Sequence, residues 1–209
     1  MVEIVTKVGN YILFILYTNY ISAFTIGEEI GLKGSGYLEL SKSLLPHDSA
    51  VEKESFSFTF SSKLTDALLM WQGQDELIDS GGDFIAVALE NGFPTLEYEL
   101  GDGPTTVIIS QTANDGIVHK ITVEREGKSA ALIFDDIHRA EGESQGALQM
   151  LNTRGNIFFG GGPGGVSTLT GGRFNTGLTG CLHSLMLKNK QINFAEDSIA
   201  TSNVVPCSE

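Results

Sequence analysis

Positively charged residues are scarce in this sequence. Lys and Arg number 13 against 26 Asp and Glu, so the formal net charge is -13 at pH 7. A chain with this balance repels polyanions unless a local basic patch overrides the net field. The best candidate patch, residues 119–128, is interrupted by Glu124 and Glu126. We therefore expect no binding to nucleic acid, to heparin or to acidic membrane surfaces.

Long hydrophobic runs are also absent. The most apolar segment, residues 11–17, is bounded by Asn10 and Thr18. It falls short of the roughly 20 apolar residues that a membrane-spanning helix needs. We therefore expect no membrane span in the mature chain.

The place and length of this apolar segment fit a signal peptide. Ile21 and Ala23 would then precede the cleavage point, and the mature chain would begin near Phe24. We expect residues 1–23 to be a signal peptide or hydrophobic leader and residues 24–209 to form a single domain. The alternatives are a buried strand, or a stretch of a longer parent chain cut at an arbitrary point.

Cysteine is limited to Cys181 and Cys207, both near the C-terminus. They lack the paired spacing of a zinc site, and the four histidines are scattered along the chain. In a secreted chain the two would form one disulfide that ties the C-terminal tail to the domain. The alternative is two free, buried thiols.

Proline is rare, with 5 residues, whereas glycine is frequent, with 25. This composition supplies turns without the proline of a disordered linker. Between the turns lie short segments with a period of two, such as Phe56, Phe58 and Phe60 in alternation with Ser and Thr. No amphipathic helix of 10 or more residues is evident. Many short strands at regular spacing predict an all-β sandwich or jelly roll of antiparallel sheets.

Motifs of catalysis are missing. Residues 160–165 satisfy the pattern G-x-G-x-x-G, but residues 166–172 do not have the character of the helix that a dinucleotide site requires. Glu97 and Glu99 share one face of a predicted strand, yet the third acid of a jelly-roll glucanase is absent. The alternation places these two residues on the solvated face. We therefore predict that the chain is not an enzyme.

Asp83 occupies a more informative position. It precedes a predicted strand that leads to the turn Asn91-Gly92, and the next strand ends at Leu100. If this turn is a two-residue hairpin loop, Asp83 faces Leu100 with Cα atoms about 5 Å apart. A carboxylate beside the free carbonyls of a strand end is half of a calcium site. An exposed aspartate without a ligand is the alternative.

Several motifs together resemble the laminin G-like domains over about residues 35–209. They are found at residues 68–73, 83–85, 99–101, 114–116 with His119, 156–161, and 180–181 with the final Cys207. The resemblance implies a concanavalin-like jelly roll of two antiparallel sheets in a secreted, non-enzymatic binding module of the extracellular matrix. One departure is Val118, where many members carry Trp, so the packing there must differ.

The resemblance also implies one weakly held Ca2+ at the rim of the sandwich. Its ligands would be the side chains of Asp83 and Asn152 and the backbone carbonyls of Leu100 and Met150. The implied partners are cell-surface receptors, either integrins or glycans of the type carried by α-dystroglycan. The alternative function is that of a secreted lectin that recognises sugars without a matrix role.

Overall fold

The computed structural model describes residues 4–8, 11–15, 29–47, 53–74 and 82–207. Two short strands, β1 (Ile4–Val8) and β2 (Tyr11–Ile15), pair with each other in a separate antiparallel sheet. They belong to the expected leader. The expected cleavage position lies outside the described residues, so the leader stays a prediction.

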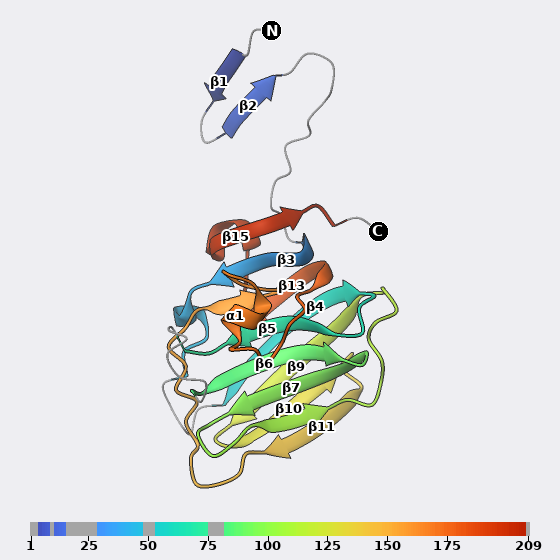
Figure 1. Cartoon of the computed structure of the whole chain (residues 1–209), viewed down its shortest axis with the longest axis vertical. Coiled ribbons are helices and arrows are strands. Elements are labelled where there is room, and N and C mark those ends of the chain that lie inside the picture. The colour runs from blue at the N-terminus through green and yellow to red at the C-terminus, as the bar shows by residue number, and fades with distance from the viewer. Residues whose placement is uncertain (1–3, 9–10, 16–28, 48–52, 75–81, 208–209) are drawn as a thin grey trace.

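The remaining strands form the body of the molecule (Figure 1). They are β3 (Ile30–Leu40), β4 (Glu54–Ser62), β5 (Ala67–Gln72), β6 (Phe84–Glu90), β7 (Phe93–Glu99), β8 (Thr105–Ile108), β9 (His119–Glu126), β10 (Ser129–Phe134), β11 (His138–Glu143), β12 (Ile157–Phe159), β13 (Thr179–Leu187), β14 (Lys190–Gln191) and β15 (Ser198–Val205). The described helices are short: η1 (Lys42–Leu44), α1 (Val166–Leu169) and α2 (Phe194–Asp197). None of the described helices is long and apolar enough to cross a membrane.

The long strand β3 is shared between two antiparallel sheets. Its first part pairs with β13, which continues through β4, β9 and β10 to β11, and its last part pairs with β12, which continues through β5, β6 and β7 to β8. Strand β15 pairs with both parts of β3. Between the two parts, Gly34 has a φ of 56°. A glycine tolerates this left-handed conformation without steric cost, which lets the strand pass from one sheet to the other.

The core lies between the two sheets. Strand β4 alternates fully between buried and half-buried residues, with Phe56, Phe58 and Phe60 inside. Phe58 packs edge-on against Phe159 of the opposite sheet, with ring centroids 5.4 Å apart. The predicted two-sheet, all-β architecture is thus confirmed, and the aromatic face of residues 56–60 is part of its centre.

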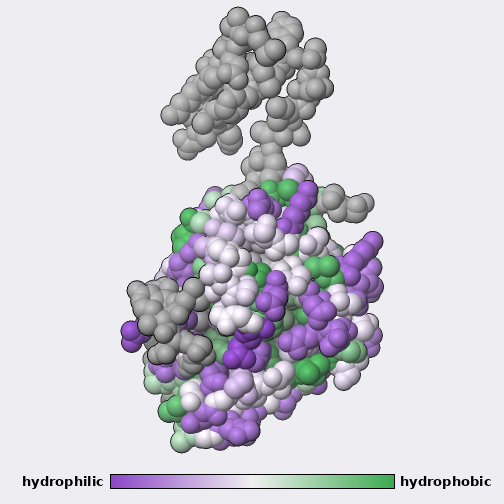
Figure 2. Space-filling view, viewed as in Figure 1, coloured by the Kyte–Doolittle hydropathy of each residue, from purple (hydrophilic) through white to green (hydrophobic). Residues whose placement is uncertain are grey.

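A second apolar cluster covers the outside of the sheet that contains β5 and β6. Trp71 stacks on Phe84 with centroids 4.9 Å apart, and Phe174 meets Trp71 edge-on. The glycine-rich segment after β12 therefore forms part of a cover that packs on the sheet, and it leads into the four-residue helix α1. Over the visible face of the body, hydrophilic residues are spread among scattered apolar ones (Figure 2).

The predicted disulfide is confirmed. Cys181 of β13 is bonded to Cys207, with Cα atoms 5.7 Å apart. The bond fastens the chain directly after β15, an edge strand that, among the described strands, pairs only with β3. It therefore holds the last strand against the sheet.

Candidate functional site

The hairpin of β6 and β7 positions the first predicted ligand. Its register runs from Glu90 opposite Phe93 to Phe84 opposite Glu99, so the connecting turn is the two-residue loop predicted from the sequence. One step further along, the same register places Asp83 opposite Leu100. The hairpin that the prediction assumed is confirmed, and its register is consistent with the predicted position of Asp83 opposite Leu100.

The structure also brings Asn152 to Asp83, although the two residues are 69 positions apart in the sequence. The backbone N–H of Asn152 donates to Oδ2 of Asp83 at 2.7 Å, and Nδ2 of Asn152 donates to the same oxygen at 3.1 Å. The carboxylate is buried, whereas Asn152 is exposed. A buried carboxylate beside an exposed asparagine suits a cation held at the rim of the sandwich.

Met150 and Asn152 lie in a segment, residues 144–156, that has no regular secondary structure. Between them Leu151 is fully buried in the core, while Met150 is 39% exposed. The turn after β7 packs on this segment, because a Cβ atom on Gly101 would lie only 2.7 Å from Cδ1 of Leu148. The turn after Leu100 and the segment that contains Met150 therefore contact each other, and Asn152 contacts Asp83. That the four positions share one ion stays a prediction.

The donor set at this rim fits a calcium ion. Calcium prefers carboxylate, amide and carbonyl oxygens, and the rim offers all three kinds. Among the described residues, no hydrogen-bond donor reaches the carbonyl oxygen of Leu100 or of Met150. The side-chain oxygen and nitrogen of Asn152 exchange places when the amide plane makes half a turn. The same side chain can then present Oδ1 as a ligand beside Asp83.

The structure corrects the prediction that Glu97 and Glu99 lie on a solvated face. Glu99 is buried, and its Oε1 accepts hydrogen bonds from the backbone N–H groups of Gly101 (2.7 Å) and Gly103 (2.8 Å). Its carboxylate therefore shapes the turn directly after Leu100. The sequence signal for this turn-supporting role is a glutamate at the end of a predicted strand with glycines two and four residues later, here Glu99, Gly101 and Gly103.

Glu97 has a different environment. Nη1 of Arg173 lies 2.5 Å from its Oε1, and the same guanidinium lies over the ring of Phe84 at 4.4 Å from the centroid. Burial raises the pKa of the Glu97 carboxyl, although the charge of Arg173 acts in the opposite direction. The alternation of polar and apolar residues predicted an exposed Glu97. That prediction is wrong because the segment before β13, which includes Arg173, covers this face of the sheet.

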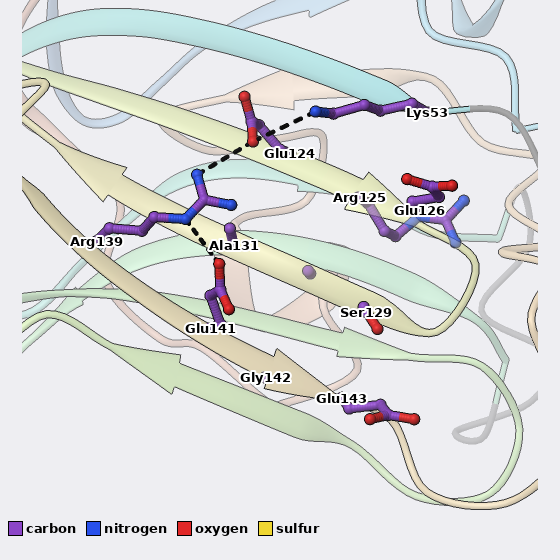
Figure 3. Close-up of a pocket in the computed structure, with 11 residues that line it drawn as sticks. Lys53, Glu124, Arg125, Glu126, Ser129, Ala131, Arg139, Glu141, Gly142 and Glu143 are labelled. Carbon is purple, nitrogen blue, oxygen red and sulfur yellow. Dashed lines mark hydrogen bonds and ion pairs between the residues drawn. The ribbon is translucent and has the colours of Figure 1, made fainter.

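A groove of about 460 Å³ lies on the outer face of β9, β10 and β11. Figure 3 shows Arg139 between Glu124 and Glu141, with Nη1–Oε2 and Nε–Oε1 distances of 3.1 and 2.7 Å. Lys53 approaches Glu124 as well, at 3.7 Å. A cation bonded to both acids leaves neither one free as a nucleophile or proton donor, so this pair gives no support for glycan cleavage.

Among the described residues, one cluster of His, Cys and acidic groups has the proximity of a metal site. It consists of Glu29, His183 and Cys207. The sulfur of Cys207 is already bonded to Cys181, and Nδ1 of His183 lies 3.0 Å from Oε2 of Glu29. We therefore assign this cluster to the structure of the C-terminal tail rather than to a metal.

Comparisons with known proteins agree with this architecture. The family model "Laminin G domain" matches residues 60–193. The chain is 34% identical over 176 residues to a basement membrane proteoglycan of Caenorhabditis elegans, and 33% identical over 153 residues to the basement membrane-specific heparan sulfate proteoglycan core protein of Mus musculus. These alignments cover 84% and 73% of this chain but only 5% and 4% of the relatives.

A solved structure shows the same fold. The LG1-3 region of the laminin alpha2 chain superposes with a TM-score of 0.73 at 25% identity, over 96% of this chain and 38% of that one. Domains of this kind are typically non-enzymatic modules that bind extracellular partners, and the proteoglycan relatives point to the extracellular matrix. The chain belongs to the laminin G domain family.

Proposed function

We propose that this chain is a secreted binding module of the extracellular matrix that holds one Ca2+ at its rim and docks a cell-surface receptor there. The side chains of Asp83 and Asn152 and the carbonyl oxygens of Leu100 and Met150 would hold the ion. The observation that carries the proposal is the contact of Asn152 with the buried carboxylate of Asp83, 2.7 Å from N to Oδ2. It joins the start of β6 to the irregular segment 144–156.

The four predicted ligands supply four oxygens, whereas calcium takes six to eight. Water or a receptor group would complete the shell. Only Asp83 carries a formal charge, so we expect weak binding, with a Kd of roughly 10⁻⁴ to 10⁻³ M, as in other extracellular modules. Such a site is loaded at the millimolar calcium concentration outside cells.

The ion would also overcome an electrostatic obstacle. With a net charge of -13, the protein repels an acidic glycan. A divalent cation beside one carboxylate makes the rim locally positive and leaves coordination positions for sugar oxygens. This is why we favour acidic glycans of the dystroglycan type as partners, with integrins as the other receptor class.

We propose that the chain corresponds to the C-terminal laminin G-like domain of a perlecan-like protein, which residues 169–181 resemble most. The two proteoglycan relatives support a basement-membrane context for the parent protein. We therefore propose a perlecan-like module, secreted into the matrix, that has no enzymatic activity. Because the chain spans only 5% and 4% of these two proteoglycans, the proposal concerns this module and not the rest of a parent protein.

Two measurements test the proposal. Calorimetric titration should show one calcium ion bound per chain, and a chain that binds none would refute the site. A glycan array with matriglycan and neutral oligosaccharides, run with calcium and with chelator, tests the partner. Chelator-sensitive binding to matriglycan alone supports the adhesion module, whereas binding to neutral sugars would favour a secreted lectin.

A further inference from the structure

A buried polar network lies behind the proposed calcium rim. Glu54 and Arg125 face each other on β4 and β9, and both side chains are almost fully buried. Nε and Nη2 of Arg125 lie 3.0 and 2.9 Å from the two carboxylate oxygens of Glu54. On the other side, Nδ1 of His47 lies 2.8 Å from Oε2 of Glu54.

This network reaches one end of the segment that carries Met150 and Asn152. Nη1 of Arg125 donates to the carbonyl oxygens of Gly127 (2.6 Å) and Gln149 (3.2 Å). Gln149 directly precedes Met150. The guanidinium therefore ties the first half of the proposed ligand segment to β9 and to the turn after it.

The network reaches the other end of the segment through Gln72 of β5. Nε2 of His47 lies 2.8 Å from Oε1 of Gln72, and Nε2 of Gln72 donates to the carbonyl oxygen of Gly155 at 3.4 Å. The backbone N–H of Gly155 in turn donates to the carbonyl oxygen of Gly73 at 2.8 Å. Both flanks of Met150 and Asn152 are thus fixed from inside the molecule.

The segment needs such anchors because it has no strand or helix of its own. A sheet position is normally set by its ladder of backbone hydrogen bonds. An apolar pair in place of Glu54 and Arg125 would fill the core equally well, but it could not donate to Gln149. A guanidinium can hold a carboxylate and a carbonyl at once, because its donors form a rigid fork.

We infer that Arg125, held by Glu54, is a positioning residue for the rim. His47 and Gln72 would position the other end of the same segment, at Gly155. Together these side chains fix residues 149–155 so that the Met150 carbonyl and the Asn152 side chain stay opposite Asp83. This inference rests on the calcium site proposed above. In metal sites, loss of such supporting groups typically weakens affinity by about 10- to 100-fold.

The test compares two variants with the unchanged chain. The double variant Glu54→Leu with Arg125→Met replaces the buried ion pair by apolar side chains of similar size, which usually preserves folding. Arg125→Lys keeps a charge opposite Glu54, but its three donors lie on one nitrogen and do not form the rigid fork with which Nε, Nη1 and Nη2 span Glu54 and Gln149. The second variant keeps the inference open to refutation if the first does not fold.

The readouts are the calcium Kd and the luminescence lifetime of bound Tb3+ in H2O and D2O, which counts water molecules on the ion. We expect a Kd raised by about 10-fold or more in both variants, with at least one additional water on Tb3+. The matched control is Tyr98→Phe, which removes another buried hydrogen bond at this end of the sandwich, from Tyr98 Oη to the Lys128 carbonyl at 2.7 Å. It should lower the unfolding temperature and leave Kd and the water count unchanged.

The outcomes separate the two proposals. If the unchanged chain binds neither calcium nor Tb3+, the rim site is wrong, and the positioning role is wrong with it. If the unchanged chain binds and the folded variants bind with the same Kd and water count, the rim site stands and the positioning role is overturned. A loss of affinity in Tyr98→Phe equal to that in the variants would also overturn it, because general destabilisation would then explain the effect.

Discussion

At the scale of single residues, the proposed rim depends on one charge. Asp83 is the only ionised side chain among the four proposed ligands, and it is buried. Its Oδ2 accepts hydrogen bonds from the backbone N–H and from Nδ2 of Asn152, which hold the two residues together. For Oδ1 of Asn152 to face an ion, the amide plane would make half a turn. The site is therefore sensitive to changes at Asp83, moderately sensitive at Asn152, and tolerant where the backbone supplies the ligand.

The first prediction concerns these ligands. Asp83→Ala should abolish calcium binding, because it removes the only charge. Asn152→Ala should weaken binding, whereas Asn152→Asp should tighten it by adding a second carboxylate. Leu100→Ile should change the affinity little, since Leu100 would act through its main-chain oxygen. Calorimetric titration of the set decides the matter, and an Asp83→Ala chain that binds calcium like the parent would rule out this site.

The second prediction concerns Glu99, which supports the turn after Leu100. Glu99→Gln keeps a hydrogen-bond acceptor but loses the charge that strengthens its bonds to Gly101 and Gly103. We expect a loss of stability of about 1 kcal/mol and a weaker calcium affinity. Glu97→Gln is the control on the same strand, because its carboxylate pairs with Arg173 and not with this turn. Equal calcium affinities for the two variants would show that the turn does not matter.

At the scale of elements, the segment that leads into β15 combines two buried apolar residues, Ile192 and Phe194, with a set of polar contacts. Asn193 caps α2, since its Oδ1 accepts from the backbone N–H groups of Ala195 and Glu196. Oδ1 and Oδ2 of Asp197 accept from Lys190 Nζ at 2.5 Å and from the backbone N–H of Asn193 at 2.9 Å. The ionised carboxylate of Asp197 thus adds polar contacts to this packing.

The third prediction is the pH dependence of this element. The hydrogen bond from Lys190, and then that from Asn193, lowers the pKa of Asp197 below its usual 3.8. A lowered pKa means that the carboxylate stabilises the folded chain above about pH 3.8, and that this stabilisation is lost as the pH falls through the folded-state value. Unfolding temperatures of the parent and Asp197→Asn should therefore differ at pH 6 and approach each other progressively as the pH falls below 3.8. A difference that is constant with pH would contradict this mechanism.

The fourth prediction concerns the disulfide. Cys207→Ser opens a link between residues 26 positions apart, and the chain-entropy account gives a cost of about 2–4 kcal/mol. Calcium affinity should be preserved, because the bond joins β13 to the tail beside the first part of β3, whereas Asp83 precedes β6. Denaturant unfolding measures the first quantity and calorimetry the second. Loss of calcium binding in a variant that remains folded would show that the tail supports the rim.

The elements also show what the sequence could and could not predict. Residues 56–60 and the hairpin around Asn91-Gly92 were predictable, because periodicity and turn type are local signals. Strand β11 was not predictable, since its residues are polar and largely exposed. Strand β3 was not predictable either, because Gly34 and Gly36 interrupt its alternation of apolar residues. Edge strands and strands that change sheets owe their position to the partner rather than to their own pattern.

The residues of the candidate site also differ in how far the sequence alone could predict them. The position of Asp83 opposite Leu100 followed from hairpin geometry, whereas Asn152 and Met150 came only from the family resemblance. The network of Glu54 and Arg125 had no sequence signal, because its partners lie 71 positions apart and ion pairs leave no periodic pattern. Supporting residues of this kind become visible only when the strands are brought together.

At the scale of the whole molecule, the acidic balance is reinforced by the pairing of its cations. Many of the basic side chains in the described part of the chain already contact a carboxylate. These pairs are Lys53 with Glu124, Lys120 with Asp136, Arg125 with Glu54, Lys128 with Glu143, Arg139 with Glu124 and Glu141, Arg173 with Glu97, and Lys190 with Asp197. A cation that is neutralised by its neighbour adds little to the attraction of a polyanion.

The last prediction follows from this pairing: the protein should pass through a heparin column unretained at physiological salt. The net charge of -13 repels a sulfated chain, and screening over about 8 Å at this salt leaves only local patches to act. One calcium ion would attract a sugar that fits its coordination shell, but it leaves the net charge of the protein strongly negative. A long sulfated chain should therefore pass unretained with calcium and with chelator alike. As a positive control, Lys at positions 126, 141 and 143 in place of Glu would build a basic patch beside Arg139 and should cause retention. Retention of the unchanged chain above physiological salt would refute the argument from charge and would require a basic surface that the described residues do not show.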